Sequence, residues 1–202
     1  MNIWDHCRLS ARKFGGEASD YFQVHKFLDS SKLFYYHFKH RALLHHTYGV
    51  ELACTKFKDY LTNSQGKVIL VRDIAIAHLK EDHNGQVPTL SDWYSGNEQL
   101  KIHEKQLPQI QNEVLRSFVW RPVLFSNMSP PLIITWSDFG IYLCHEVLGI
   151  DLAIELQKLI DQQPTIKSYL EAFKITQRWQ YTPDKNEIIW LKNQQHNNQI
   201  HG

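Results

Sequence analysis

The chain has 202 residues, of which 43% are hydrophobic and 21% are charged. This is the composition of a globular protein, and it excludes an intrinsically disordered chain. The length suits one medium-sized domain or two small ones. The formal net charge of +1 provides no overall electrostatic field that would attract nucleic acid or an anionic membrane.

The sequence carries no signal for export or for membrane insertion. Its first residues lack a basic segment followed by an apolar run, and no apolar stretch approaches the roughly 18 to 20 residues of a membrane-spanning helix. We therefore expect a soluble protein of the cytoplasm. The three cysteines, Cys7, Cys54 and Cys144, are widely spaced and form no CxxC pair, so we expect small buried hydrophobic residues rather than a zinc ribbon or a redox motif.

The N-terminal half shows helical patterns separated by turn signals. Residues 3–14 predict a helix that Gly15 and Gly16 stop. The short apolar run 68–71, after a turn signal at 63–66, indicates a small strand. Other helices are predicted over residues 20–27, from about residue 30 to Tyr48 with Gly49 as its end, over 50–61, over 72–82, and as a capped turn over 89–93.

The C-terminal half predicts further helices and one hairpin. A helical pattern covers 98–119, with a kink expected at Pro108, and the proline-containing segment 120–136 predicts a loop or crossover. Later segments predict a helix from Ser137 to Gly149, another from Asp151, and a β-hairpin over 175–191. The fold class is mainly α, with a helical domain (1–95) that includes a small β element. An α+β C-terminal region (96–202) ends in the hairpin and folds either separately or as one unit with the first.

Histidine is the unusual component, since eight of the 12 histidines lie between His6 and His83. The strongest local signal is His78 followed by Glu81 and Asp82. On a helix, positions three and four apart share a face, so the imidazole would lie beside both carboxylates. One imidazole and one carboxylate from a single turn are a common half-site for zinc, manganese or iron.

Two further segments offer histidines. His25 lies one helical turn before Asp29, and four histidines occupy positions 37, 40, 45 and 46. On a straight helix, His40 and His45 would point roughly 140° apart, at about 100° per residue. At least one or two of these four must therefore cap, pack or face solvent instead of binding one ion.

These segments predict a divalent metal site of zinc, manganese or iron. The candidate ligands are His25, His40, His45, His78 and Asp82. Glu81 would act as general base or hold a ligand in place. Arg41 and Arg72 would hold an anion, or would instead form ion pairs with Asp73 or Glu51 within the fold.

Two functions from different classes follow. The first is a metal-binding protein that hydrolyses a phosphorylated or nucleotide-like substrate. The second is a non-catalytic interaction protein, in which the histidines fix helix contacts and the aromatic hairpin at 175–191 binds a protein partner. Net charge gives no indication of a nucleic-acid partner.

Residues 24–93 resemble a family of small uncharacterised bacterial and phage proteins. The matching blocks are His25, Asp29 and Ser31-Lys32; His40-Arg41-Ala42-Leu43-Leu44-His45-His46 with Gly49; Asn63-Ser64-x-Gly66; Val71-Arg72-Asp73-Ile74; His78-x-x-Glu81-Asp82; and Pro88-Thr89-Leu90-x-x-Trp93. The family is a domain of unknown function, so the resemblance implies a folding unit rather than an activity. The pattern of histidines and aspartates on predicted helices also loosely resembles that of HD-type metal-dependent phosphohydrolases. Those proteins carry an adjacent His-Asp pair where this chain has His45-His46.

Overall fold

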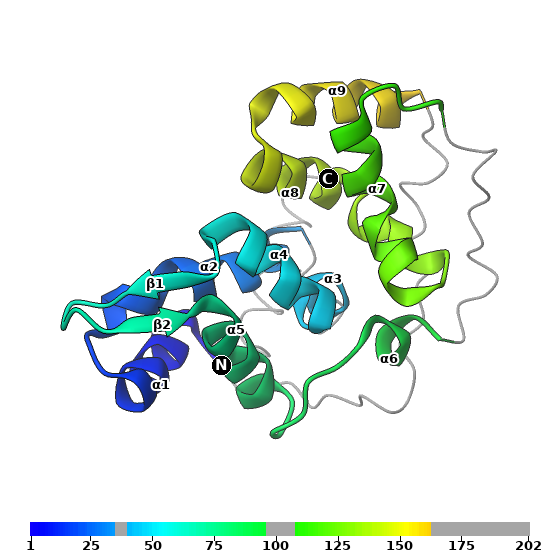
Figure 1. The fold of residues 1–202 in the computed structure, drawn as a ribbon. Coiled ribbons are helices and arrows are strands. Elements are labelled where there is room, and N and C mark those ends of the chain that lie inside the picture. Colours follow the sequence, from blue (N-terminus) through cyan, green and yellow to red (C-terminus); the bar gives the residue numbers. More distant parts are fainter. Residues whose placement is uncertain (35–39, 96–107, 163–202) are drawn as a thin grey trace, which may run out of the picture.

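The computed structural model describes residues 1–34, 40–95 and 108–162, and it is mainly helical with one two-stranded sheet (Figure 1). The first part contains α1 (Ile3–Phe14), the 3-10 turn η1 (Ala18–Tyr21), α2 (Phe22–Leu28), η2 (Ser30–Leu33), α3 (Arg41–Leu44), α4 (Thr47–Phe57), β1 (Tyr60–Thr62), β2 (Val68–Leu70), α5 (Val71–Asp82) and α6 (Leu90–Tyr94). The second contains α7 (Glu113–Ser126), η6 (Pro130–Ile134), α8 (Asp138–Leu148) and α9 (Ile150–Asp161).

Helix ends follow the capping signals of the sequence. Asn2 accepts a hydrogen bond from Asp5 N at the start of α1, and Gly15, with φ of 88°, ends that helix. Thr89 and Asp92 form a capping box at α6. Ser137 accepts from Gly140 N at α8. Because such caps satisfy orphan backbone groups with nearby side chains, these boundaries could be predicted, and they are confirmed.

The small sheet consists of β1 and β2 in antiparallel pairing, with Leu61 opposite Ile69. Ile69 is buried while its neighbours on β2 are exposed, which is the alternation of a strand with one face on the core. In the connecting turn, Asn63 Oδ1 accepts hydrogen bonds from the backbone N–H groups of Gln65 and Lys67. The predicted strand is confirmed, and β2 leads directly into α5.

The prediction of one helix reaching Tyr48 is wrong, because the chain bends at His45 and His46. His45 has φ −86° and ψ 61°, and His46 is extended. Both ring nitrogens of His46 hold the bend: Nδ1 accepts from Gly49 N at 3.1 Å, and Nε2 donates to Ala42 O at 3.0 Å. Gly49 therefore lies inside α4 instead of ending a helix, with the backbone of Leu44 packed against it.

The prediction of a loop over 120–136 is also wrong, because α7 continues through Pro122 to Ser126. Proline costs a helix one backbone hydrogen bond, but Pro122 continues the buried stripe of Leu115, Phe118 and Val119. Burial of this stripe outweighs the local penalty. Residues 98–107 of the helix predicted over 98–119 and all of the hairpin at 175–191 lie outside the described residues. Residues 108–112 are not helical, because α7 begins only at Glu113.

Helices α2, α4 and α5 lie against one another, and α1 packs on α2 and α5 (Figure 1). Buried apolar side chains from both parts of the chain, such as Leu52 and Phe118, belong to one continuous hydrophobic cluster. Among the described helices, none combines the length and apolar character needed to cross a membrane. The packing of α1, α2, α4 and α5 places the histidine segments side by side.

Replacing Gly49 by Ala should destabilise the fold strongly. A Cβ at this position would lie 1.8 Å from Leu44 O, so the bend would have to open, at a cost of about 3 kcal/mol. Gly66→Ala is the control: its φ of 78° strains a side chain, but no heavy atom lies within 4 Å of the added Cβ, so about 1 kcal/mol is expected. Urea denaturation measures the free energy of unfolding of both variants. Equal losses of stability would contradict the packing at the bend.

Candidate metal centre

Four side chains from three segments converge at the centre of the N-terminal helices. Asp29 caps the C-terminus of α2, His45 occupies the bend between α3 and α4, and His78 and Asp82 share one face of α5. Each offers one ligand atom, and these atoms all lie within 4.8 Å of one another. The four side chains are at most 1% exposed, so the group is enclosed by protein.

The distances between the donor atoms fit a common ligand shell. His45 Nε2 lies 3.1 Å from Asp82 Oδ2, 3.1 Å from His78 Nε2 and 3.5 Å from Asp29 Oδ1. His78 Nε2 lies 3.7 Å from the Asp29 oxygen and 3.9 Å from the Asp82 oxygen. Ligands at about 2.0–2.2 Å from a tetrahedral zinc ion are about 3.3–3.6 Å apart. The observed separations bracket that range.

Several polar atoms of the group have no hydrogen bond within the described part of the chain. These atoms include Asp82 Oδ2, Asp29 Oδ2 and His45 Nδ1. Buried polar atoms are nearly always paired, because an unpaired one costs the full price of its desolvation. A donor set with lone pairs left over is what a cation site requires, so the residues fit a divalent metal ion.

Three cations lie beside the carboxylates, one of which is the N-terminal ammonium group of Met1, 3.4 Å from Asp82 Oδ1. Lys32 Nζ lies 2.9 Å from Asp29 Oδ1, and Arg41 Nη2 lies 3.4 Å from Asp82 Oδ2. Arg41 Nη1 also donates to the backbone oxygen of Asp82 at 3.2 Å. Burial alone would raise the pKa of Asp29, but hydrogen bonding to His45 and the charge of Lys32 hold it well below its ordinary value. Burial opposes ionisation of Asp82 as well, but hydrogen bonding to His45 and His6 holds its pKa well below the ordinary value. Both acids are therefore carboxylates at neutral pH.

Two buried imidazoles of this region, those of His78 and His25, are neutral. Burial holds the pKa of His78 well below its ordinary value, and it lowers that of His25 to about 3. Neutral imidazole is the form that binds metals. His6 behaves differently: burial lowers its pKa, but Asp82 and Glu81 outweigh this effect and raise it overall.

The structure places the other predicted residues outside the group. His40 is buried with its ring 5.2 Å from that of His45, and its Nδ1 lies 3.4 Å from Ser31 Oγ. Glu81 Oε2 lies 2.5 Å from His6 Nδ1. Arg72 is on the surface, paired with Glu51 at 2.6 Å, which is one of the two arrangements that the sequence left open for it.

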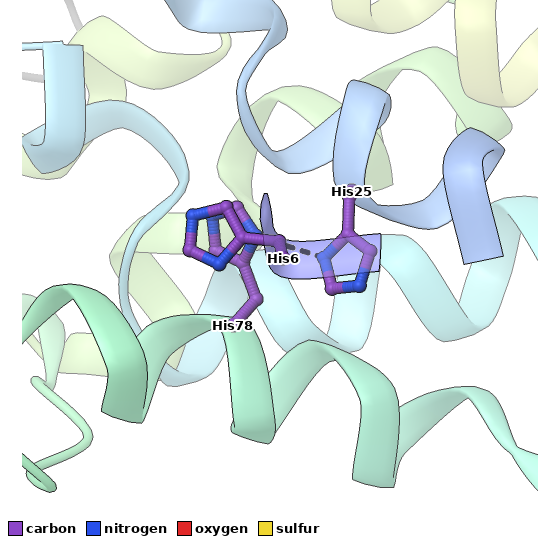
Figure 2. Close-up of side chains that lie close together, drawn as sticks. All are labelled: His6, His25 and His78. Atoms are coloured by element: carbon purple, nitrogen blue, oxygen red, sulfur yellow. Dashed lines mark hydrogen bonds between the residues drawn. The ribbon is translucent and has the colours of Figure 1, made fainter. Parts of the chain in front are cut away.

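His25 lies on the far side of His78 from the four donors. Its Nδ1 is 3.0 Å from His78 Nδ1, whereas the opposite nitrogen of His78 faces His45. Figure 2 shows His25 reaching from α2 toward His78 on α5, with the His6 ring over the His78 ring. His6, His25 and His78 also form a group whose ligand atoms all lie within 4.8 Å of one another.

Sequence reasoning missed two residues of this region, Asp29 as a donor and His6 as a neighbour. Asp29 was visible as the partner of His25 one turn away, but its oxygen faces His45 and His78 instead. His6 is separated from Glu81 by 75 positions. The side chain of His6 points inward because of the way α1 packs against α5. No pattern of neighbouring residues in the sequence predicts that packing.

The fold and this site define a mainly helical domain with a buried group of histidines and aspartates that could hold a metal ion. The model of the family DUF6915, a domain of unknown function, matches residues 1–102, and the chain belongs to that family. The match is longer than the segment 24–93 that contains the family-like motifs, and it includes α1 with His6. Comparison with curated proteins and with solved structures gives no match, and no HD-type hydrolase family matches.

Arg41→Met should destabilise the metal-free protein by about 3 kcal/mol, because it leaves the buried carboxylate of Asp82 without a nearby guanidinium. Arg72→Met is the matched control. Its ion pair with Glu51 is half exposed, so its loss should cost less than about 1 kcal/mol. Urea denaturation in EDTA measures both changes, and an Arg41 variant no less stable than the Arg72 variant would contradict the buried ion pair.

Proposed function

We propose that this protein binds one divalent transition-metal ion through Asp29, His45, His78 and Asp82. The observation that carries the proposal is the convergence of four enclosed donor atoms from three segments of the chain. Two imidazoles and two carboxylates are a ligand set suited to zinc, manganese or iron. The ion would join α2, the α3–α4 bend and α5 at one point.

The closed surroundings favour a structural role for the ion. A catalytic metal keeps a coordination position open to water or substrate, whereas a structural zinc ion is closed by four protein ligands. Here the four donor side chains are at most 1% exposed. Hydrolysis of a phosphorylated substrate would need this enclosure to open. It would also need an anion-binding cation, whereas Arg41 contacts Asp82 and Arg72 contacts Glu51.

The alternative is that the protein binds no metal and that its histidines only stabilise the fold. The hydrogen bonds of His46 favour this alternative. Both of its ring nitrogens are committed to backbone partners at the bend. His45 differs from it, because its Nδ1 has no hydrogen bond within the described residues and its Nε2 faces three other donors. The two adjacent histidines thus differ in role: His46 fixes the backbone, and His45 is available to bind a metal ion.

Protein purified without a histidine tag should contain close to one equivalent of zinc, manganese or iron, or take it up on reconstitution. His45→Ala and Asp82→Ala should each remove most of this metal. His145→Ala is the control, because this half-exposed histidine lies on α8 beside Glu146, away from the group. Elemental analysis by mass spectrometry gives the stoichiometry, and a wild-type protein without metal after reconstitution overturns the proposal.

Removal of the metal should lower thermal stability. An ion that binds only the folded state stabilises it by about 2.7 kcal/mol at a free concentration 100 times its Kd. Adding EDTA should therefore lower the Tm of the wild-type protein, and zinc should restore it. Asp82→Ala should not respond to either reagent. An identical response of variant and wild type would place the ion elsewhere on the protein.

A further inference from the structure

The two nitrogens of His78 face different partners, and this difference assigns a role to His25. His78 Nε2 points into the donor group, 3.1 Å from His45 Nε2. His78 Nδ1 points the opposite way, 3.0 Å from His25 Nδ1 (Figure 2). His25 Nε2 in turn lies 2.9 Å from Ser10 Oγ on α1. Ser10, His25 and His78 are each fully buried.

The rings of His25 and His78 meet edge to edge. Their centroids are 5.2 Å apart with an interplanar angle of 26°, while the facing nitrogens are only 3.0 Å apart. The nitrogens therefore lie between the two centroids, and the lone pair or N–H of each lies near the line that joins them. This is the geometry of an N–H···N hydrogen bond.

The same geometry argues against a metal ion held by His6, His25 and His78 together. The His6 and His78 rings stack face to face, with centroids 4.0 Å apart and an interplanar angle of 28°. An imidazole binds a metal through a lone pair in the plane of its ring. Two stacked rings direct these lone pairs along neighbouring planes, so one of the rings would have to turn before both could bind one ion.

We infer that His25 is a positioning residue that holds His78 as a metal ligand, and not a ligand itself; this inference rests on the proposed function. A neutral imidazole has one donor and one acceptor nitrogen. When His78 Nε2 gives its lone pair to the ion, Nδ1 carries the proton and donates to His25 Nδ1. His25 then carries its own proton on Nε2 and donates to Ser10 Oγ. Partners of this kind fix the tautomer and orientation of ligating histidines.

If the two hydrogen bonds that link Ser10, His25 and His78 ran in the opposite direction, His78 could not bind the metal ion. If Ser10 donated to His25 and His25 donated to His78, the remaining proton of His78 would occupy Nε2. Binding therefore reverses all three groups together without changing the number of protons. His78 Nε2 loses its proton as the ion takes its place, the proton of His25 Nδ1 passes to His78 Nδ1, and His25 Nε2 takes up one proton in exchange. No charge is left in the buried chain, because each imidazole stays neutral in both directions.

Zinc affinity of the full chain, measured by competition with a chelating dye, tests the role of His25. His25→Leu removes the acceptor and should weaken binding by about 10- to 100-fold while the stoichiometry stays at one. His25→Asn places an amide oxygen near the position of Nδ1 and should recover most of the affinity. The visible spectrum of the Co²⁺ form should be the same for wild type and His25→Asn, because the ligand set does not change.

Nitrogen-15 NMR of the wild-type protein gives a second readout that does not depend on the folding of any variant. In the Zn²⁺ form, His78 should have Nε2 bound to metal and Nδ1 protonated, and neither nitrogen of His25 should show metal coordination. A metal-bound nitrogen on His25, or a His25→Leu variant with unchanged affinity, overturns the inference and leaves the proposed site intact. A wild-type protein that binds neither Zn²⁺ nor Co²⁺ overturns the proposed function, and this inference with it.

Discussion

The contact between His45 and the two candidate ligands of α5 is the constraint on which the rest of this structure depends. His45 Nε2 lies 3.1 Å from both Asp82 Oδ2 and His78 Nε2. All three side chains are buried, and burial of polar and charged groups costs free energy unless each finds a partner. The surrounding helices supply those partners: Arg41 beside Asp82, and Asp29 with Lys32 beside His45. A metal ion at this point would satisfy the remaining lone pairs.

The bend at His45 and His46 makes that contact possible. Trp93 Nε1 donates to His45 O at 3.1 Å, and Thr47 N donates to Pro88 O at 2.8 Å. The segment that leads into α6 thereby holds the backbone at the point where α3 ends and α4 begins. His46 secures the same point from within. A rigid bend limits the positions of the His45 ring, which is what an organised ligand needs.

Sequence alone predicts those parts of the fold and site that depend on near neighbours. The half-site of His78 and Asp82, the strand at 68–71 and the caps at Thr89 and Ser137 all rest on residues within a few positions. The bend at His45 could not be predicted, because its backbone partners lie more than 40 residues away. His25 was identified as a candidate ligand, yet spacing cannot tell which nitrogen of His78 it faces. His6 reaches the group only through the packing of α1.

A crystal structure of the Zn²⁺-loaded protein, with anomalous data at the zinc edge, tests the central claim most directly. We expect one strong peak at about 2.0–2.2 Å from Nε2 of His45 and His78 and from carboxylate oxygens of Asp29 and Asp82, with His25 outside ligand distance. Absence of a peak among these four side chains, or rings of His45 and His78 turned away from one another, would contradict the account.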